Sequence, residues 1–296
     1  MKVLSWILAI ALTARLPAAG APLILGVLEQ PQCKDEQKQA GRLLFAKVGK
    51  SWIALDHGYS KLKGFNPSLQ SWTISLDGHS LGKINLRDQD PATPNPMDWN
   101  YGRDKLYEAL GSGSLPIRAN HSKAFAGWCG TPSLRPLVIL SESNVDDPGK
   151  WQVFSPEGSY RQRLFASLKR AIGQSKVLHC VGKSEVPKPF KFNPFDLVLY
   201  KGYRSAFGRE IVSIGIDQKN FKCDGVLGPE WSNHWFLVEG TSIKFIGREM
   251  ELVDVGDYDR DGQPEFLFWH SGYNQDGYVL MHDHFKQKSE YLWGYH

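Results

Sequence analysis

Short apolar segments bounded by turn residues recur along the chain, and they limit its fold more than any other feature. In the second half they follow one another with no long helix between them, at 195–200, 211–216, 235–238, 243–246, 250–255, 265–269 and 277–282. Consecutive strands joined by short links form antiparallel sheets. The sequence therefore predicts a mainly β fold of antiparallel sheets, arranged as a β-propeller-like structure or as a β-sandwich.

Two hairpins are predicted in the first half of the chain. Residues 42–55 carry apolar runs on both sides of Gly49-Lys50, and the alternating run that opens residues 71–84 leads into Asp77-Gly78. Glycine in a two-residue turn tolerates the positive φ that such turns need. We therefore expect each pair of runs to fold back on itself.

Three further elements are expected in the middle of the chain. Residues 137–140 (LVIL) predict a buried strand that pairs with residues 151–154, and residues 104–110 predict a short helix. Apolar side chains recur at helical spacing over residues 159–174, which predicts an amphipathic helix. Its arginines and lysines are either a surface for an acidic partner or, as we favour, the solvated face of an ordinary helix packed on a sheet.

The first residues have the three parts of a secretory signal. Lys2 precedes an apolar run over residues 3–12, and Ala19-Gly20-Ala21 forms a small-residue cleavage pattern. The apolar run is too short for a membrane anchor, because a bilayer-spanning helix needs roughly 20 residues. We therefore expect residues 1–21 to be a cleaved signal peptide. The protein would be secreted or periplasmic and would have no membrane span after signal removal.

A proline-rich stretch at 187–194 (PKPFKFNP) is a candidate boundary within the rest of the chain. On this basis we expect an N-terminal, mainly β region with one helix over residues 22–186. A C-terminal β region would follow over residues 187–296. The alternative is that the two regions form a single domain.

Four cysteines follow the signal: Cys33, Cys129, Cys180 and Cys223. An even number of cysteines in an oxidising compartment favours two disulfides, and three connectivities are possible. The pair Cys180–Cys223 is favoured because each residue ends a strand-like stretch. Buried free thiols are the alternative. Residues 120–122 (NHS) form an N-glycosylation sequon for a eukaryotic host.

The sharpest chemical motif is the stretch 256–265 (GDYDRDGQPE). Aspartates at alternate positions of a tight loop can direct their carboxylates at one cation, and the glycine after them permits a sharp turn. The following residues add a backbone carbonyl and a closing glutamate, and such oxygen ligands suit calcium. A solvated acidic turn is the alternative. The predicted Ca²⁺ ligands are Asp257, Asp259, Asp261, Gln263 and Glu265.

The spacing D-x-D-x-D-G-x-x-E between two predicted strands resembles the calcium loop of FG-GAP/VCBS-type repeats, which occur in integrin-like β-propellers. It differs from an EF-hand, whose closing glutamate stands at loop position 12, where this chain has Phe268. The resemblance covers about residues 243–285, which corresponds to one blade, and the rest of the chain stays unassigned. It implies that the five residues named above are the calcium positions.

No catalytic residue and no further cofactor is assigned from the sequence. His282 and His284 lie two residues apart, on one face of an expected strand, and could bind a transition metal or exchange protons. A polar strand face is the more ordinary interpretation. Motifs for a nucleophile elbow, a zinc protease or a phosphate loop are missing from the sequence. Aromatic residues in loop-like stretches could contact a ligand instead of filling the core: Trp99, Tyr101, Trp128 and Trp231.

These features together predict an exported calcium-binding β protein with a binding or scaffolding role and a structural ion. Its partner would be a protein or a carbohydrate. Nucleic acid is not expected, because 35 Lys and Arg against 31 Asp and Glu give a net charge of only +4. The alternative is a secreted hydrolase acting on polysaccharide or cell-wall material, whose ion would open into a pocket beside His282 or His284.

Overall fold

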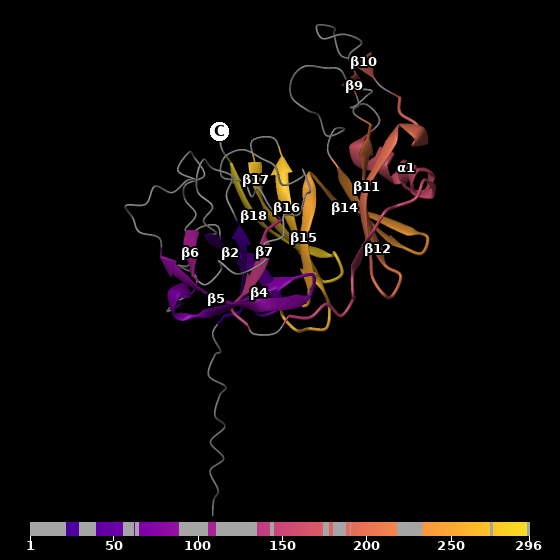
Figure 1. The fold of residues 1–296 in the computed structure, drawn as a ribbon. Coiled ribbons are helices and arrows are strands. Elements are labelled where there is room, and N and C mark those ends of the chain that lie inside the picture. The colour runs from indigo at the N-terminus through magenta and orange to yellow at the C-terminus, as the bar shows by residue number, and fades with distance from the viewer. Residues whose placement is uncertain are drawn as a thin grey trace, which may run out of the picture.

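A computed structural model describes residues 22–29, 40–55, 62, 65–88, 106–110, 135–142, 145–173, 178–179, 188–189, 191–217, 233–272 and 275–294. Within these ranges the chain consists mainly of antiparallel strands with one α-helix (Figure 1). The predicted fold class is therefore confirmed. In the same part of the chain, no helix has the length and apolar character that a membrane crossing requires.

The strands of the first half are β1 (Ile24–Glu29), β2 (Ala40–Val48), β3 (Ser51–Ala54), β4 (Ser71–Leu76), β5 (His79–Asp88), β6 (Leu106–Leu110) and β7 (Leu137–Leu140). The next are β8 (Gln152–Phe154), β9 (Leu178–His179), β10 (Lys188–Pro189), β11 (Leu197–Arg204), β12 (Glu210–Ile216), β13 (His234–Glu239) and β14 (Ser242–Arg248). The last are β15 (Met250–Gly256), β16 (Glu265–Gly272), β17 (Gln275–His282) and β18 (Gln287–Gly294). The helical elements are α1 (Ser159–Ile172) and the 3-10 turns η2 (Pro67–Leu69) and η5 (Pro194–Asp196).

The first seven strands form one sheet in the order β1-β7-β4-β5-β6-β2-β3. Strand β1 also pairs with β2, so the series of pairings returns to its starting strand. The other edge of β2 is shared by β6 and β3, which pair with its first and last residues respectively. Every residue of β1 is buried, because its two edges are paired and both of its faces are covered.

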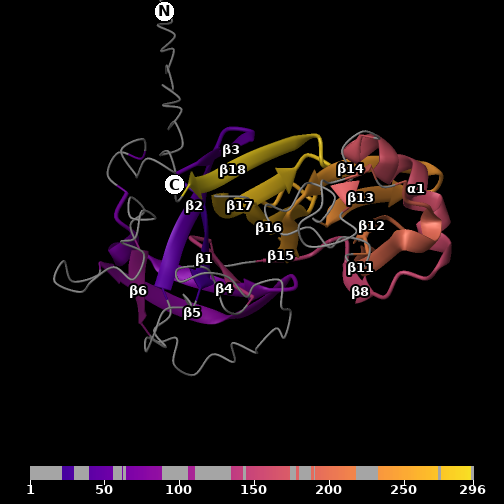
Figure 2. The same ribbon diagram turned by 90° about the horizontal axis from the view of Figure 1, so that it is seen from above.

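The remaining large sheets are consecutive meanders. One has the order β14-β13-β12-β11-β8, and the other has the order β15-β16-β17-β18. Side chains of the four-stranded sheet contribute to two different hydrophobic clusters, one shared with the seven-stranded sheet and one shared with the five-stranded sheet. Helix α1 covers the other face of the five-stranded sheet. The four-stranded sheet therefore lies between the other two (Figures 1 and 2), a stacking that fits a β-sandwich.

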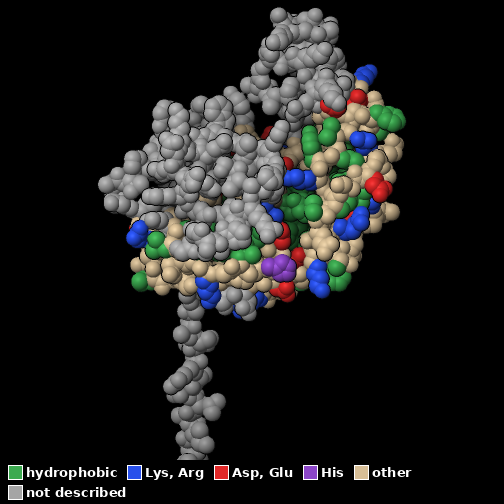
Figure 3. All heavy atoms as spheres, in the orientation of Figure 1, with side chains coloured by type: hydrophobic (Ala, Val, Ile, Leu, Met, Phe, Trp, Pro, Cys, Tyr) green, Lys and Arg blue, Asp and Glu red, His purple; other side chains and the backbone are tan. Residues whose placement is uncertain are grey.

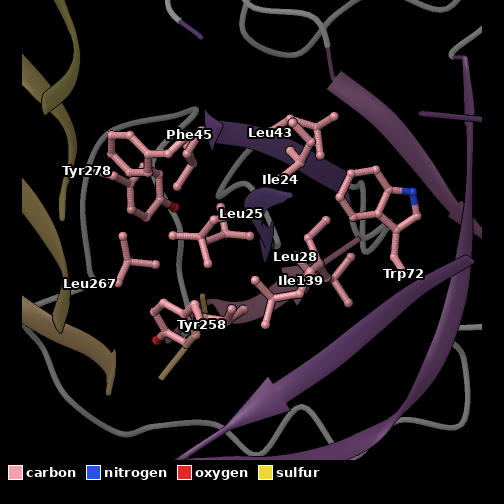
Figure 4. Close-up of a cluster of buried hydrophobic side chains, with 14 of the residues drawn as sticks. Ile24, Leu25, Leu28, Leu43, Phe45, Trp72, Ile139, Tyr258, Leu267 and Tyr278 are labelled. Atoms are coloured by element: carbon pink, nitrogen blue, oxygen red, sulfur yellow. The ribbon is translucent and has the colours of Figure 1, made fainter. Parts of the chain in front are cut away.

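The cluster shared by the seven-stranded and four-stranded sheets is the main core. In Figure 4, Tyr258, Leu267 and Tyr278 from the C-terminal part converge on Leu25 of β1. All four side chains are fully buried. Burying one large apolar side chain contributes about 1.5–3 kcal/mol, so this interface supplies much of the force that holds the first and last strands together.

Several predicted elements are confirmed. Strands β2 and β3 join at Gly49-Lys50, and β4 and β5 join at Asp77-Gly78. The predicted amphipathic helix is α1, and the strand predicted over residues 137–140 is β7. Local turn chemistry and helical periodicity were therefore sufficient for these elements.

Two predictions for the middle of the chain are wrong. Within the segment 104–110 that was expected to be helical, the described residues 106–110 form strand β6, which pairs with both β5 and β2 and whose Tyr107 is completely buried. Residues 152–154 pair with β11, whereas residues 137–140 pair with β1 and β4. In both cases distant strands supply hydrogen-bond partners that outweigh the local preference of a short segment.

Strands β1 and β18 were not predicted. Several other sequence predictions concern residues outside the described ranges, namely the signal peptide, the four cysteines, the sequon and the four loop aromatics. The division at residue 187 stays a prediction. Strand β8 and helix α1 precede that residue. However, β8 pairs with β11, and α1 packs on the sheet that contains β11, as expected if the two regions form a single domain.

Candidate metal centre

The acidic loop connects β15 to β16 at one end of the four-stranded sheet. Gly256 and Glu265 are opposite each other in the register of these two strands, so the loop leaves and rejoins the sheet at one point. This pairing brings Asp257, which directly follows Gly256, next to Glu265. The strand register thus places the first and last acidic residues of the motif side by side.

Three carboxylates of the loop converge. One oxygen from each of Asp257, Asp259 and Glu265 lies within 4.8 Å of the others. Asp257 and Glu265 are buried, and Asp259 is half-buried. Three negative charges at such separations repel one another strongly where little water screens them. A cation placed between them would remove that repulsion.

Backbone N–H groups hold the two buried carboxylates in position. The amides of Asp261 and Gly262 donate to the two carboxylate oxygens of Asp257 at 3.0 and 2.9 Å. The amide of Tyr258 donates to Oε2 of Glu265 at 2.8 Å. Gly262 has a φ of +85°, a conformation that glycine adopts without strain. The loop's own backbone therefore orients these two carboxylates.

Both buried carboxylates resist ionisation. Burial and, to a smaller extent, the nearby charge of Asp259 raise the pKa of Glu265 to about 8, although the hydrogen bond from the Tyr258 N–H opposes the shift. Burial also raises the pKa of Asp257, with the N–H of Gly262 opposing the shift. The charged forms are costly here in the absence of a counter-charge. Chemically, the site favours a bound cation or a bound proton.

Asp261 and Gln263, the other two predicted ligands, lie outside the group of three, and their side chains differ in exposure and in hydrogen bonding. The carboxylate of Asp261 is exposed, does not belong to the group of three, and accepts a hydrogen bond from the amide of Gln263 at 2.8 Å. The side-chain oxygen Oε1 of Gln263 is buried and has no hydrogen-bond partner among the described residues. An orphaned amide oxygen in an acidic loop is chemically suited to a hard cation. The sequence alone predicts only the backbone carbonyl of Gln263 as a ligand.

One basic side chain already contacts the group. The ammonium of Lys47, on β2, forms an ion pair with Oδ2 of Asp259. It also lies 5.3 Å from the centre of the Trp52 ring on β3. Because Lys47 comes from the seven-stranded sheet, this contact could not be anticipated from the loop sequence.

The loop is also tied to the segment that leads into β8. The amide of Asp257 donates to the carbonyl of Asp146 at 2.7 Å. The carboxylate of Asp147 accepts hydrogen bonds from the amides of Gly149 and Trp151 at 2.9 and 2.5 Å. The two adjacent acids before Pro148-Gly149 therefore serve as a turn.

The two candidate histidines do not share a strand face. Strand β17 ends at His282, and His284 lies in the following turn with a φ of +54°. His282 is buried, and burial lowers the pKa of its imidazole. A ring nitrogen of exposed His284 instead lies 3.1 Å from the guanidinium of Arg209. The expected pairing on one face is therefore wrong, because the chain leaves the extended conformation between them.

The basic residues of α1 are partly used for packing. Arg161 donates to the carbonyl of Leu197 at 2.8 Å, and Arg163 donates to the carbonyl of Gly240. Both acceptors belong to the sheet that the helix covers or to its turns. On the face shown in Figure 3, lysines and arginines are interspersed with acidic and apolar side chains. These contacts agree with the interpretation of α1 as an ordinary amphipathic helix.

Comparison with known proteins adds no family assignment. No model of a protein family matches the chain, and no curated protein or solved structure matches it significantly. The resemblance to FG-GAP/VCBS-type repeats therefore rests on the loop and its flanking strands, and it stays a prediction.

Proposed function

We propose that the protein is an exported calcium-binding β protein in which the acidic loop holds one structural ion, and that its role is binding or scaffolding. The observation that carries the proposal is the convergence of Asp257, Asp259 and Glu265, whose carboxylate oxygens lie within 4.8 Å of one another. These three side chains would hold the ion. Its contribution would be to neutralise charges that the fold has brought together.

The chemistry of the donors favours calcium over other metals. The group consists of carboxylates, and the buried Oε1 of Gln263 is a further oxygen that needs a partner. Hard cations prefer such oxygen donors, whereas zinc and copper sites in proteins usually include histidine or cysteine. A loop of alternating aspartates can also adjust to the irregular geometry that calcium tolerates and magnesium does not.

The position of the loop supports a structural role for the ion. The loop contacts Asp146 on one side and Lys47 on another, and the strand register holds its base closed. At a free calcium concentration ten times the dissociation constant, binding would stabilise the fold by about 1.4 kcal/mol. Such a gain in folding stability would be useful to a protein outside the cell, where calcium is available.

The binding role is supported by features outside the loop. The predicted export signal would place the protein outside the cytoplasm, and residues 243–285 resemble a repeat found in integrin-like proteins. Some large aromatic side chains also stay at the surface: Phe195 and Phe207 are 92% and 79% exposed. Such rings offer apolar contact to a protein or carbohydrate partner.

Calcium titration of the purified protein tests this proposal. We expect isothermal titration calorimetry to show one site, and calcium to raise the melting temperature relative to a chelator. Asp257→Asn and Glu265→Gln should abolish both effects. Glu157→Gln is the matched control, because it removes one exposed carboxylate outside the loop. The proposal fails if calcium up to about 10 mM, above the usual range of extracellular modules, neither binds nor shifts the melting temperature.

A further inference from the structure

Lys47 reaches the acidic loop from a different sheet. Its ammonium pairs with Oδ2 of Asp259 although the two residues are 212 positions apart. The side chains are only 17% and 4% exposed, respectively. Solvent and salt screen such a sheltered pair less than they screen an ion pair on the surface.

The same carboxylate is needed for the proposed ion. Asp259 is one of the three carboxylates that converge, and its neighbours Asp257 and Glu265 have their oxygens within 4.8 Å. A divalent cation held by this group would lie close to the Lys47 ammonium, and the two positive charges would repel. We therefore propose that Lys47 is an internal competitor for calcium, which pairs with Asp259 without the ion and is displaced when the ion binds. This inference rests on the proposed function.

The displaced ammonium has a second partner nearby, the indole ring of Trp52. Lys47 and Trp52 are direct cross-strand partners in the β2–β3 hairpin, and the ammonium is already 5.3 Å from the centre of the indole ring. A cation near the face of a tryptophan ring is attracted by its π electrons. We expect the lysine side chain to keep this contact when it leaves Asp259, with the strands in place.

This competition links the ion to the contact between two sheets. Without calcium, the Lys47–Asp259 pair joins β2 of the seven-stranded sheet to the loop of the four-stranded sheet. With calcium, the ion would hold the loop and the pair would be broken. By reciprocity, calcium weakens the Lys47–Asp259 pair by the same factor as the pair weakens calcium binding.

Two lysine variants of equal charge test the inference. Lys47→Met removes the competitor, whereas Lys50→Met removes a lysine from the exposed turn of the same hairpin. We expect Lys47→Met to bind calcium about fivefold more tightly than the wild type in calorimetric titration, since a partly buried ion pair contributes on the order of 1 kcal/mol. Lys50→Met should stay within about twofold of the wild type, because an exposed charge away from the site is screened.

The outcomes separate this inference from the proposed function. Equal affinities for Lys47→Met and the wild type would overturn the competition and leave the calcium site standing. If none of the three proteins binds calcium, the proposed function fails. Binding by Lys47→Met alone would support the competition but refute calcium binding by the native chain.

A spectroscopic readout keeps the test informative if Lys47→Met folds poorly. Displacement of the ammonium near Trp52 should change tryptophan emission when calcium is added to the wild type. Trp52→Phe should remove that change while calcium still binds, and Lys47→Gln should remove it while binding more tightly. Calcium binding by the wild type with no change in Trp52 emission would contradict displacement of the lysine.

Discussion

The hydroxyl of Tyr278 donates a 2.6 Å hydrogen bond to Oε2 of Glu29, which lies 249 positions earlier in the chain. The other oxygen of Glu29 accepts bonds from Nε and a terminal nitrogen of Arg42 at 2.9 and 2.8 Å. The Arg42 guanidinium lies 4.6 Å from the centre of the Trp293 ring. Strands of the seven-stranded and four-stranded sheets thus meet at one buried carboxylate whose two oxygens are both hydrogen-bonded, which fixes how these sheets pack.

Tyr278→Phe should destabilise the protein by about 1–3 kcal/mol, because the buried Oε2 of Glu29 would lose its hydrogen-bond donor. Urea unfolding of the variant and the wild type would measure the difference. Tyr200→Phe is the control, since it removes the same hydroxyl from a side chain that is 41% exposed. A loss no larger than that of the control would mean that the bond does not contribute to sheet packing.

Two glycines in equivalent hairpin turns should respond differently to alanine. Gly49 and Gly78 have φ values of +60° and +71°, so either substitution forces alanine into a left-handed conformation that costs about 1–2 kcal/mol. A Cβ on Gly49 would meet nothing within 4 Å, but on Gly78 it would lie 2.4 Å from Cβ of Asp147. Gly78→Ala should therefore lose roughly 1–3 kcal/mol more than Gly49→Ala in chemical unfolding. Equal losses would show that the segment around Asp147 moves aside freely.

Asp276 should make stability fall as the pH rises through weakly acidic values. Burial raises the pKa of its carboxyl from 3.8 to about 6, and the Ser271 hydroxyl offsets part of the shift. The folded state therefore holds this proton more tightly than the unfolded state, so its stabilising contribution is complete below about pH 4 and is lost as the pH rises through 6.

Asp276→Asn removes this titration. We expect the variant to gain stability relative to the wild type as the pH rises from 4 to 7, reaching about 1–2 kcal/mol in urea unfolding. Burial also raises the pKa of Asp254 to about 6, but that group is present in both proteins and its effect cancels in the difference. Parallel stability profiles for the two proteins would exclude a role for Asp276.

The aspartates of the loop should contribute unequally to calcium binding. Asp259 belongs to the converging group, whereas the carboxylate of exposed Asp261 is occupied with the amide of Gln263. Asp259→Asn should therefore weaken calcium binding at least about tenfold, and Asp261→Asn should weaken it less, since loss of a ligand costs more than loss of a nearby charge. Calorimetric titration of both variants would decide the order. A greater loss for Asp261→Asn would indicate that the loop rearranges when it binds the ion.

Much of the local structure could be predicted because its causes are local. The turns at Gly49-Lys50 and Asp77-Gly78, the helical spacing of α1 and the alternating aspartates each act over a few residues. The loop spacing alone could not show that Asp257, Asp259 and Glu265 converge while Asp261 turns elsewhere. That difference depends on the strand register and on which backbone amides each carboxylate meets.

By itself, the sequence determined that this chain forms antiparallel strands with one amphipathic helix and one acidic loop, since periodicity and turn residues specify these directly. Only the tertiary structure decided that residues 106–110 form a strand between β5 and β2, that Lys47 reaches Asp259, and that Glu29 meets Tyr278. These contacts join residues far apart in the chain. They exist because stacking the sheets buries apolar faces, and no short segment carries the information about which distant partner it will face.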